Sequence, residues 1–156
     1  MACRDSGFEG ETETLSLAVQ LDEVGRAIAW LEALSERDGW PERTRFALQL
    51  SLEEALTNVI MHGFTEETSS AQVLSVDCAR QPDMILLHVT DNGTPFDPTS
   101  LEEKPLPLSI ESAVIGGHGI RLMRRMLDEF SYRRIDGLNR LSLGRRLDRE
   151  DQSPPA

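Results

Sequence analysis

The sequence predicts an α/β (α+β) two-layer sandwich, in which a mixed, mostly antiparallel sheet is covered by helices on one face. Two observations lead to this fold class. Apolar residues recur at helical spacing in three segments and at strand-like spacing in five others. Short turns join four of the strands in two pairs, 73–79 with 84–90 and 130–135 with 139–147, which favours antiparallel neighbours. Helices that are segregated from a largely antiparallel sheet are typical of such a sandwich.

The first part of the chain is expected to form one strand and two helices. Residues 15–19 alternate between apolar and polar, as in a half-buried strand. Asp22 is placed to cap a helix over 22–37, and Gly39 is placed to end it. A second helix is predicted over 41–62, because proline suits its first turn and a glycine follows its last residue.

The second part is expected to form the four paired strands, one loop and one helix. Turn residues at 81–83 and 136–137 separate the strands of the two pairs. Between the pairs lies an irregular stretch, 93–117, which contains four prolines. A loop of this length inside a compact domain is usually functional, often a lid, or else disordered. A third helix is predicted over 120–129.

Length and composition indicate one soluble domain. The chain has 156 residues, 39% hydrophobic and 28% charged, which is enough to bury a core without disulfides. We place the domain at residues 12–147, between flexible polar tails at 1–11 and 148–156. No apolar run approaches the roughly 20 residues that span a bilayer, and the N-terminus lacks the apolar centre of a signal peptide. Two distant cysteines, Cys3 and Cys78, form no disulfide framework, so a reducing, cytoplasmic setting is expected.

The charge of the chain limits its partners. The formal net charge of −11 argues against direct nucleic-acid binding and against anionic membranes. Nine of the sixteen Lys and Arg residues lie between Arg121 and Arg149, whereas the acidic residues concentrate in the first two thirds of the chain. This asymmetry is either a solvated surface that favours solubility or an acidic face that attracts a basic protein.

A first motif lies in the second predicted helix. Phe46, Leu50, Glu54 and Asn58 follow one another at i, i+4 spacing and so fall along one row of the helix. Two polar groups therefore continue a row that begins apolar. Alone, the motif fits a solvated edge of the buried stripe as well as it fits a site.

A second motif, Asp91-Asn92-Gly93, follows an apolar strand-like run. A carboxylate at a strand end can accept a hydrogen bond from an exocyclic amine such as that of adenine. Glycine lets the backbone approach a flat ring because no side chain intervenes. The ordinary alternative is a simple turn.

A third motif, Gly117-His118-Gly119, opens the third predicted helix. Glycines there expose backbone N–H groups at the positive end of the helix, where phosphate oxygens bind. The ordinary alternative is a flexible glycine hinge. No Rossmann or Walker pattern accompanies the motif.

Together, in this order, the three motifs resemble the N, G1 and G2 boxes of the Bergerat (GHKL) ATP-binding fold, which gyrase, Hsp90, histidine kinases and MutL share. The stretches 53–64, 91–98 and 117–129 most resemble the bacterial anti-sigma-factor serine/threonine kinases, or switch-protein kinases, and the likeness extends over about 12–147. One departure is Pro95, which stands where the superfamily usually has a second glycine. The switch-protein kinases often tolerate this replacement.

The resemblance implies roles for residues of the first two motifs. Asn58 would bind Mg²⁺ through its amide oxygen, which suits a cation that takes oxygen ligands and few protein groups. Glu54 would act as the catalytic residue that orients or deprotonates the attacking hydroxyl. Asp91 would bind the adenine amine of ATP, and Gly93 would pack under the base.

The resemblance also implies a phosphate cradle and a lid. Gly117 and Gly119 would hold the phosphates, and His118 between them either contacts a phosphate or is an ordinary loop residue. The segment 99–116 would be the ATP lid. Lys104, the sole lysine of the chain, lies in that lid and is a candidate phosphate contact or a solvated loop residue.

The function implied by the resemblance is that of an ATP- and Mg²⁺-dependent serine/threonine protein kinase that acts as an anti-sigma factor. It would sequester a sigma factor and phosphorylate a STAS-domain anti-anti-sigma protein, and a homodimer is the expected assembly. The alternative is a non-catalytic nucleotide-binding partner-switch module. A detached sensor-kinase domain is disfavoured, because no phosphoacceptor helix precedes the motifs.

Overall fold

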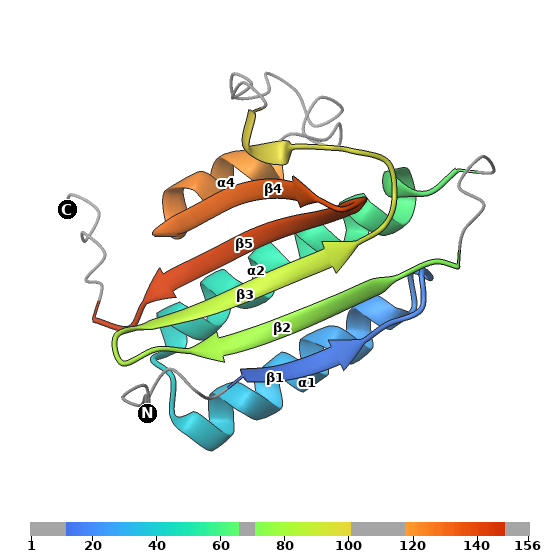
Figure 1. The fold of residues 1–156 in the computed structure, drawn as a ribbon. Coiled ribbons are helices and arrows are strands. Elements are labelled where there is room, and N and C mark those ends of the chain that lie inside the picture. Colours follow the sequence, from blue (N-terminus) through green and yellow to red (C-terminus); the bar gives the residue numbers. More distant parts are fainter. Residues whose placement is uncertain (1–11, 66–70, 101–117, 149–156) are drawn as a thin grey trace, which may run out of the picture.

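The computed structural model describes residues 12–65, 71–100 and 118–148. Its strands are β1 Thr12–Ser16, β2 Leu74–Arg80, β3 Met84–Asp91, β4 Glu129–Ile135 and β5 Leu138–Arg146. Its helices are α1 Glu23–Asp38, α2 Glu42–Asn58 and α4 His118–Met126, with a π-helical turn η2 Val59–Gly63 and a 3-10 turn η3 Pro98–Ser100. Helices on one face of a single sheet make the predicted two-layer sandwich (Figure 1).

The sheet has the strand order β1-β2-β3-β5-β4. Both predicted hairpins are present, and β5 pairs with β3 so that the second hairpin joins the first. The predicted sheet was mixed, but all four pairings among the described strands are antiparallel. Strands that are joined by a short turn pair in antiparallel fashion, whereas a parallel pair would need a long crossover connection.

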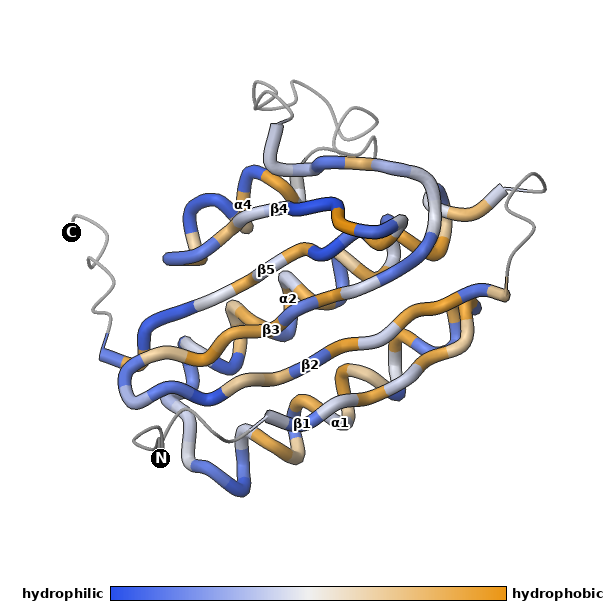
Figure 2. Tube along the Cα trace, in the orientation of Figure 1, coloured by the Kyte–Doolittle hydropathy of each residue, from blue (hydrophilic) through white to orange (hydrophobic). Residues whose placement is uncertain are grey.

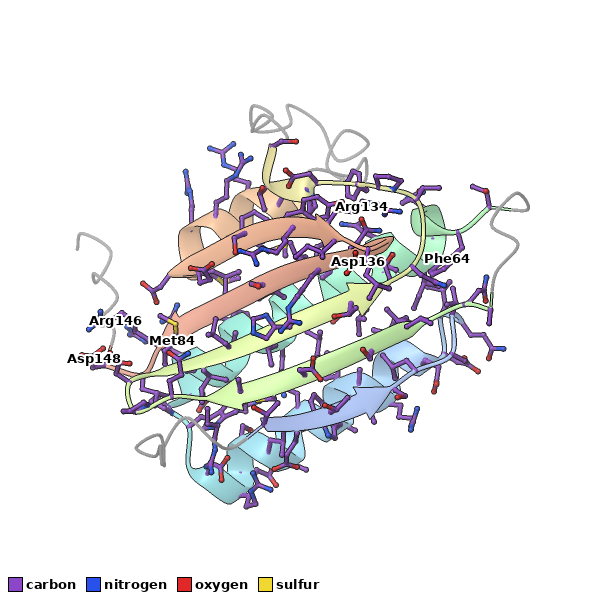
Figure 3. All side chains as sticks on the ribbon, in the orientation of Figure 1. Phe64, Met84, Arg134, Asp136, Arg146 and Asp148 are labelled. Carbon is purple, nitrogen blue, oxygen red and sulfur yellow. The ribbon has the colours of Figure 1, made fainter. Side chains whose placement is uncertain are left out.

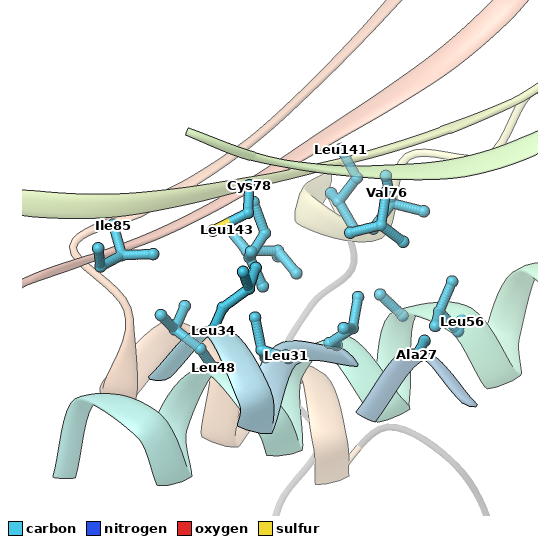
Figure 4. Packing of buried hydrophobic residues seen from close by; sticks show 14 of the residues in the cluster. Ala27, Leu31, Leu34, Leu48, Leu56, Val76, Cys78, Ile85, Leu141 and Leu143 are labelled. Carbon is cyan, nitrogen blue, oxygen red and sulfur yellow. The ribbon is translucent and has the colours of Figure 1, made fainter. Parts of the chain in front are cut away.

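The core lies between the sheet and the helical layer. Leucines of α1 and α2, including Leu31 and Leu48, are fully buried and face inward residues of the central strands such as Ile85 and Leu143 (Figure 4). Hydrophobic residues make up much of β3, whereas hydrophilic residues alternate with hydrophobic ones along α4 (Figure 2). Burial of this apolar area is the main stabilising contribution to the domain.

Cys78 packs in this core with a free thiol. Burial raises the pKa of that thiol to about 12, so it stays protonated at neutral pH. Cys3 lies outside the described residues, as do the predicted tail 1–11 and all of the tail 148–156 except its first residue.

One strand and one helix cap differ from the prediction in the first part of the chain. The first strand is Thr12–Ser16, where residues 15–19 were predicted, and it does not reach Val19. Leu17 is buried and its amide still donates to the Leu74 carbonyl at 2.9 Å, so the apolar alternation continues past the last paired residue. Asp22 occupies the N-cap position of α1, but its side chain makes no capping hydrogen bond. Gly39 ends α1 as predicted, at φ 65°.

Two helix ends also differ from the prediction. The α-helical part of α2 ends at Asn58, and residues 59–63 continue it as the π-turn η2. The last helix ends at Met126 and not at residue 129. Glu129 pairs instead with Gly144 at the start of β4, because the Asp128 amide already donates to the Gly144 carbonyl at 2.8 Å.

Candidate nucleotide site

A pocket opens where α2 and η2 meet the ends of β3 and β5. Figure 3 shows Phe64 and Arg134 near this end of the sheet, opposite the end that carries Met84 and Arg146. The lining combines apolar side chains with a few polar groups, as in ligand pockets generally. It consists of Ala55, Asn58, Val59, His62, Gly63, Val89, Asp91, Thr94, Pro95, Phe96, Pro98, Met123, Tyr132, Asn139 and Leu141.

Asp91 is the buried acid of this pocket. Its Oδ1 accepts hydrogen bonds from the Gly93 amide at 2.8 Å and from Asn139 Nδ2 at 2.9 Å. Within the described residues, no hydrogen-bond donor reaches Oδ2 of this carboxylate. Burial raises the pKa of the Asp91 carboxyl, while the hydrogen bonds from Asn139 and Gly93 and the charge of Arg134 oppose the rise.

Asn139 is a site residue that the sequence analysis missed. Its Nδ2 donates to Asp91 and to the Thr94 carbonyl, each at 2.9 Å. Its Oδ1 accepts from Tyr132 Oη at 2.5 Å and from Arg134 Nη1 at 2.9 Å. Asn139 therefore orients the carboxylate of Asp91. A polar residue at an inward position of β5, two residues before the buried Leu141, is the signal that could have revealed it.

The backbone after Asp91 lies against the π-turn. Gly93 is buried, and the amide of Thr94 donates to the Gly63 carbonyl at 2.8 Å. A Cβ on Gly93 would collide with that same carbonyl oxygen. Gly93 is thus required by the close approach of its backbone to that of Gly63. Single π-turns of this kind are frequent at functional sites.

The first and third motifs meet between α2 and α4. Asn58 lines the pocket, and Glu54 lies one helical turn earlier along α2. The backbone of Gly119, in the first turn of α4, lies so close to Glu54 that a Cβ there would overlap the carboxyl group. Neither Glu54 nor Asn58 has a side-chain hydrogen bond within the described residues. Both side chains remain available to a ligand at the positive end of α4.

The structure describes only some of the other predicted site residues. His118 is the first residue of α4. Gly117 and Lys104 lie outside the described residues, as does most of the predicted lid. The described start of the lid is held to α4, because Arg124 Nη2 donates to the Thr99 carbonyl at 2.9 Å. The structure thus brings together Glu54, Asn58, the second motif and Gly119, which are far apart in the sequence.

Comparisons with known proteins agree with this geometry. The family of histidine kinase-like ATPase domains matches residues 17–144. The serine/threonine-protein kinase BtrW of Bordetella bronchiseptica is 41% identical over 136 residues, which cover 87% of this chain and 94% of BtrW. The serine-protein kinase RsbW of Listeria monocytogenes is 27% identical over 120 residues, 74% of this chain and 75% of RsbW.

A solved structure shows the same fold. The crystal structure of the RsbU and RsbW domains of Rv1364c from Mycobacterium tuberculosis superposes with a TM-score of 0.62 at 15% identity. The match covers 93% of this chain and 35% of that longer one. In the part of the chain that the structure describes, no helix is long and apolar enough to cross a membrane. The family match and the BtrW relationship confirm the resemblance to the switch-protein kinases, and the chain belongs to the histidine kinase-like ATPase family.

Proposed function

We propose that this protein is an ATP- and Mg²⁺-dependent serine/threonine protein kinase that also acts as an anti-sigma factor. The observation that carries the proposal is the meeting of Glu54 with the N-terminal turn of α4, one helical turn from Asn58 and beside the Asp91 pocket. A base, an oxygen ligand for Mg²⁺ and backbone N–H groups at a helix N-terminus can together position and stabilise a γ-phosphate during phosphoryl transfer. The names of the relatives BtrW and RsbW, both protein kinases, support the same reaction.

ATP would bind with its adenine in the Asp91 pocket. Oδ2 of Asp91, which has no partner within the described residues, would accept a hydrogen bond from the exocyclic amine, and Gly93 would pack under the base. Apolar side chains such as Val59, Met123 and Leu141 would contact the faces of the base. The phosphates would then lie toward the first turn of α4, where backbone N–H groups are unsatisfied.

Asn58 would hold Mg²⁺. Its amide oxygen is a suitable ligand, and within the described residues no cluster of three or more His, Cys, Asp or Glu side chains could hold an ion by itself. A site with one protein ligand fits a cation that is bound mainly by phosphate oxygens and water. When bound, Mg²⁺ would neutralise charge on the phosphates.

Glu54 would act as the general base for the incoming hydroxyl. As the serine or threonine oxygen bonds to the γ-phosphorus, the bond from that phosphorus to the β,γ-bridging oxygen breaks and ADP leaves. The hydroxyl proton passes to the Glu54 carboxylate. In this scheme the protein positions the reacting groups and stabilises their charge, and no covalent intermediate forms on the protein.

The protein substrate would be a STAS-domain anti-anti-sigma protein. Its phosphorylation would stop it from binding, so that a homodimer of this protein stays free to hold a sigma factor. The direct test mixes the protein with a STAS-domain protein encoded beside its gene, adds Mg²⁺ and ATP, and follows intact mass. One phosphate on a partner serine or threonine is expected. Bound nucleotide without transfer to any such partner would instead support the non-catalytic partner-switch module.

Glu54→Gln is expected to keep ATP binding and to slow phosphotransfer about a hundredfold or more, because glutamine preserves size but cannot accept the proton. Intact-mass time courses give the rate, and calorimetry gives the affinity. The matched control is Glu53→Gln, which removes the same charge from the adjacent, exposed position and should leave both unchanged. Loss of binding together with transfer would make Glu54 a structural residue.

Asn58→Ala is expected to abolish Mg²⁺-ATP turnover, because the substitution removes the amide oxygen that would hold the ion. The control is ADP binding in EDTA, where no ion is present and the variant should bind like the wild type. A variant that retains Mg²⁺-dependent binding and transfer would refute the assigned role of Asn58.

A further inference from the structure

The outer face of the sheet is covered by none of the described helices, because α1, α2 and α4 all pack on the other face (Figure 1). Over β3, β5 and β4 this outer face is hollowed. Outward residues alternate with inward ones along each strand, so this hollow lies on the face opposite the nucleotide pocket, and Tyr132 is the residue that lines both. The hollow is lined by His88, Glu129, Ser131, Tyr132, Arg133, Ile135, Arg140 and Ser142.

Two arginines are cross-strand neighbours in this hollow. Arg133 of β4 and Arg140 of β5 are direct partners in the antiparallel register. Like charges in directly opposite positions destabilise a sheet. Within the described part of the chain, neither guanidinium has a hydrogen bond or an ion pair. Arg146, also on β5, is instead paired with Asp148 at 3.1 Å. The opposed pair is unexpected in a protein with a net charge of −11.

Further hydrogen-bonding groups lie two residues along the same strands, at the next outward position. Ser131 and Ser142 are the next outward pair, roughly 7 Å away by strand geometry. Ser142 Oγ is 2.8 Å from Nδ1 of His88 on β3. The hydroxyl of Ser131 is engaged by the Glu129 carboxylate at 2.5 Å. Glu129 itself pairs with Gly144, two residues further from the arginines along each strand. The hollow therefore has one basic and one acidic end.

We propose that this basic end is a binding site for a phosphate-class oxyanion, held by Arg133 and Arg140 with Ser142 and His88 beside them. Guanidinium groups bind phosphate oxygens with paired, charge-assisted hydrogen bonds. An anion between the two arginines replaces their mutual repulsion with two attractions. The ligand is identified by its chemistry: a free phosphate ion or the phosphate group of a small metabolite.

The charged groups around His88 give the site a pH dependence. Burial and the charge of Arg140 lower the pKa of His88, while Asp77 and Glu129 act in the opposite direction. A bound anion favours the protonated imidazole, so phosphate binding should raise the pKa of His88.

The test is a titration of the full chain with inorganic phosphate at constant ionic strength, followed by NMR of the His88 ring and of the β4 and β5 amides. Saturable shifts are expected. In Arg140→Ala, binding should weaken about tenfold or more, because a charge-assisted contact is lost. The matched control, Arg146→Ala, removes the same charge from the same strand and should bind like the wild type.

Arg133→Glu separates loss of the site from loss of the fold. It places opposite charges on the two partners, so the melting temperature without phosphate should rise while the phosphate response disappears. A parallel titration with glycerol 3-phosphate distinguishes the sources: tighter binding indicates an organic phosphate, and equal binding indicates the free ion. An unchanged response in Arg133→Glu, or shifts that chloride reproduces, would overturn the proposal.

Discussion

Asp91→Asn is expected to abolish ATP binding while leaving the domain folded. An asparagine oxygen in the place of Oδ1 can still accept from the Gly93 amide and from Asn139, which preserves the local structure. The amide nitrogen would then take the place of Oδ2 and point a donor at the donating amine of adenine. A carboxylate acceptor would be exchanged for a repulsive contact between two donors, so calorimetry should show at least a hundredfold loss of affinity, about 3 kcal/mol.

The same substitution should change how stability depends on pH. Burial raises the pKa of Asp91 in the folded protein above its unfolded value. The resulting stabilisation is present in full below the unfolded pKa and is lost as the pH rises through the folded pKa. At neutral pH the wild type therefore carries the cost of a buried charge that asparagine does not have. Urea unfolding should show the variant gaining stability relative to the wild type between acid and neutral pH.

A matched control for this experiment is Asp83→Asn, in the exposed turn between β2 and β3. It should change neither ATP affinity nor the pH profile of unfolding. If Asp91→Asn keeps wild-type affinity, the base does not bind at this carboxylate. A variant that binds poorly and also unfolds easily would show that Asp91 is needed chiefly for structure.

The fold could be predicted because its signals are local. Each hairpin has two strand-like runs and a turn between them, and the C-terminal glycine of α1 has the left-handed conformation that its position suggests. The boundaries that were missed depend on tertiary contacts. Leu17 is apolar whether it belongs to a strand or to a packed connection, and its burial does not reveal where pairing stops. Likewise, the end of α4 is set by the pairing of Glu129 with β5.

The site could be predicted as far as its residues belong to contiguous motifs. Glu54, Asn58, Asp91 and Gly93 were predicted in this way, and the structure places all four at or beside one pocket. Asn139 belongs to no motif and acquires its role only from the register that sets it beside Asp91. The opposition of Arg133 and Arg140 on the outer face also requires that register. Sequence patterns reveal residues close in the chain, whereas these pairs are close only in the folded sheet.

Gly93→Ala is the second substitution with a large expected effect. The backbone of Gly93 has no left-handed conformation that would disfavour alanine, so the penalty comes from contact alone. An added Cβ would meet the Gly63 carbonyl oxygen, and the Thr94 amide holds that carbonyl in place. The chain after Asp91 would have to move away from the π-turn. We expect a loss of about 1–3 kcal/mol in the free energy of unfolding, together with loss of ATP binding.

Two further glycines make this prediction specific. In Gly119→Ala the added Cβ would meet the flexible side chain of Glu54, which can move, so phosphotransfer should fall with little change in unfolding free energy. Gly25 lies in α1 with open space around its missing side chain, and alanine there should stabilise the helix by about 0.5–1 kcal/mol. Chemical denaturation and calorimetry on the three variants separate the effects. Equal stability for Gly93→Ala and the wild type would mean that the π-turn yields, and that close packing of Gly93 on Gly63 does not shape the nucleotide pocket.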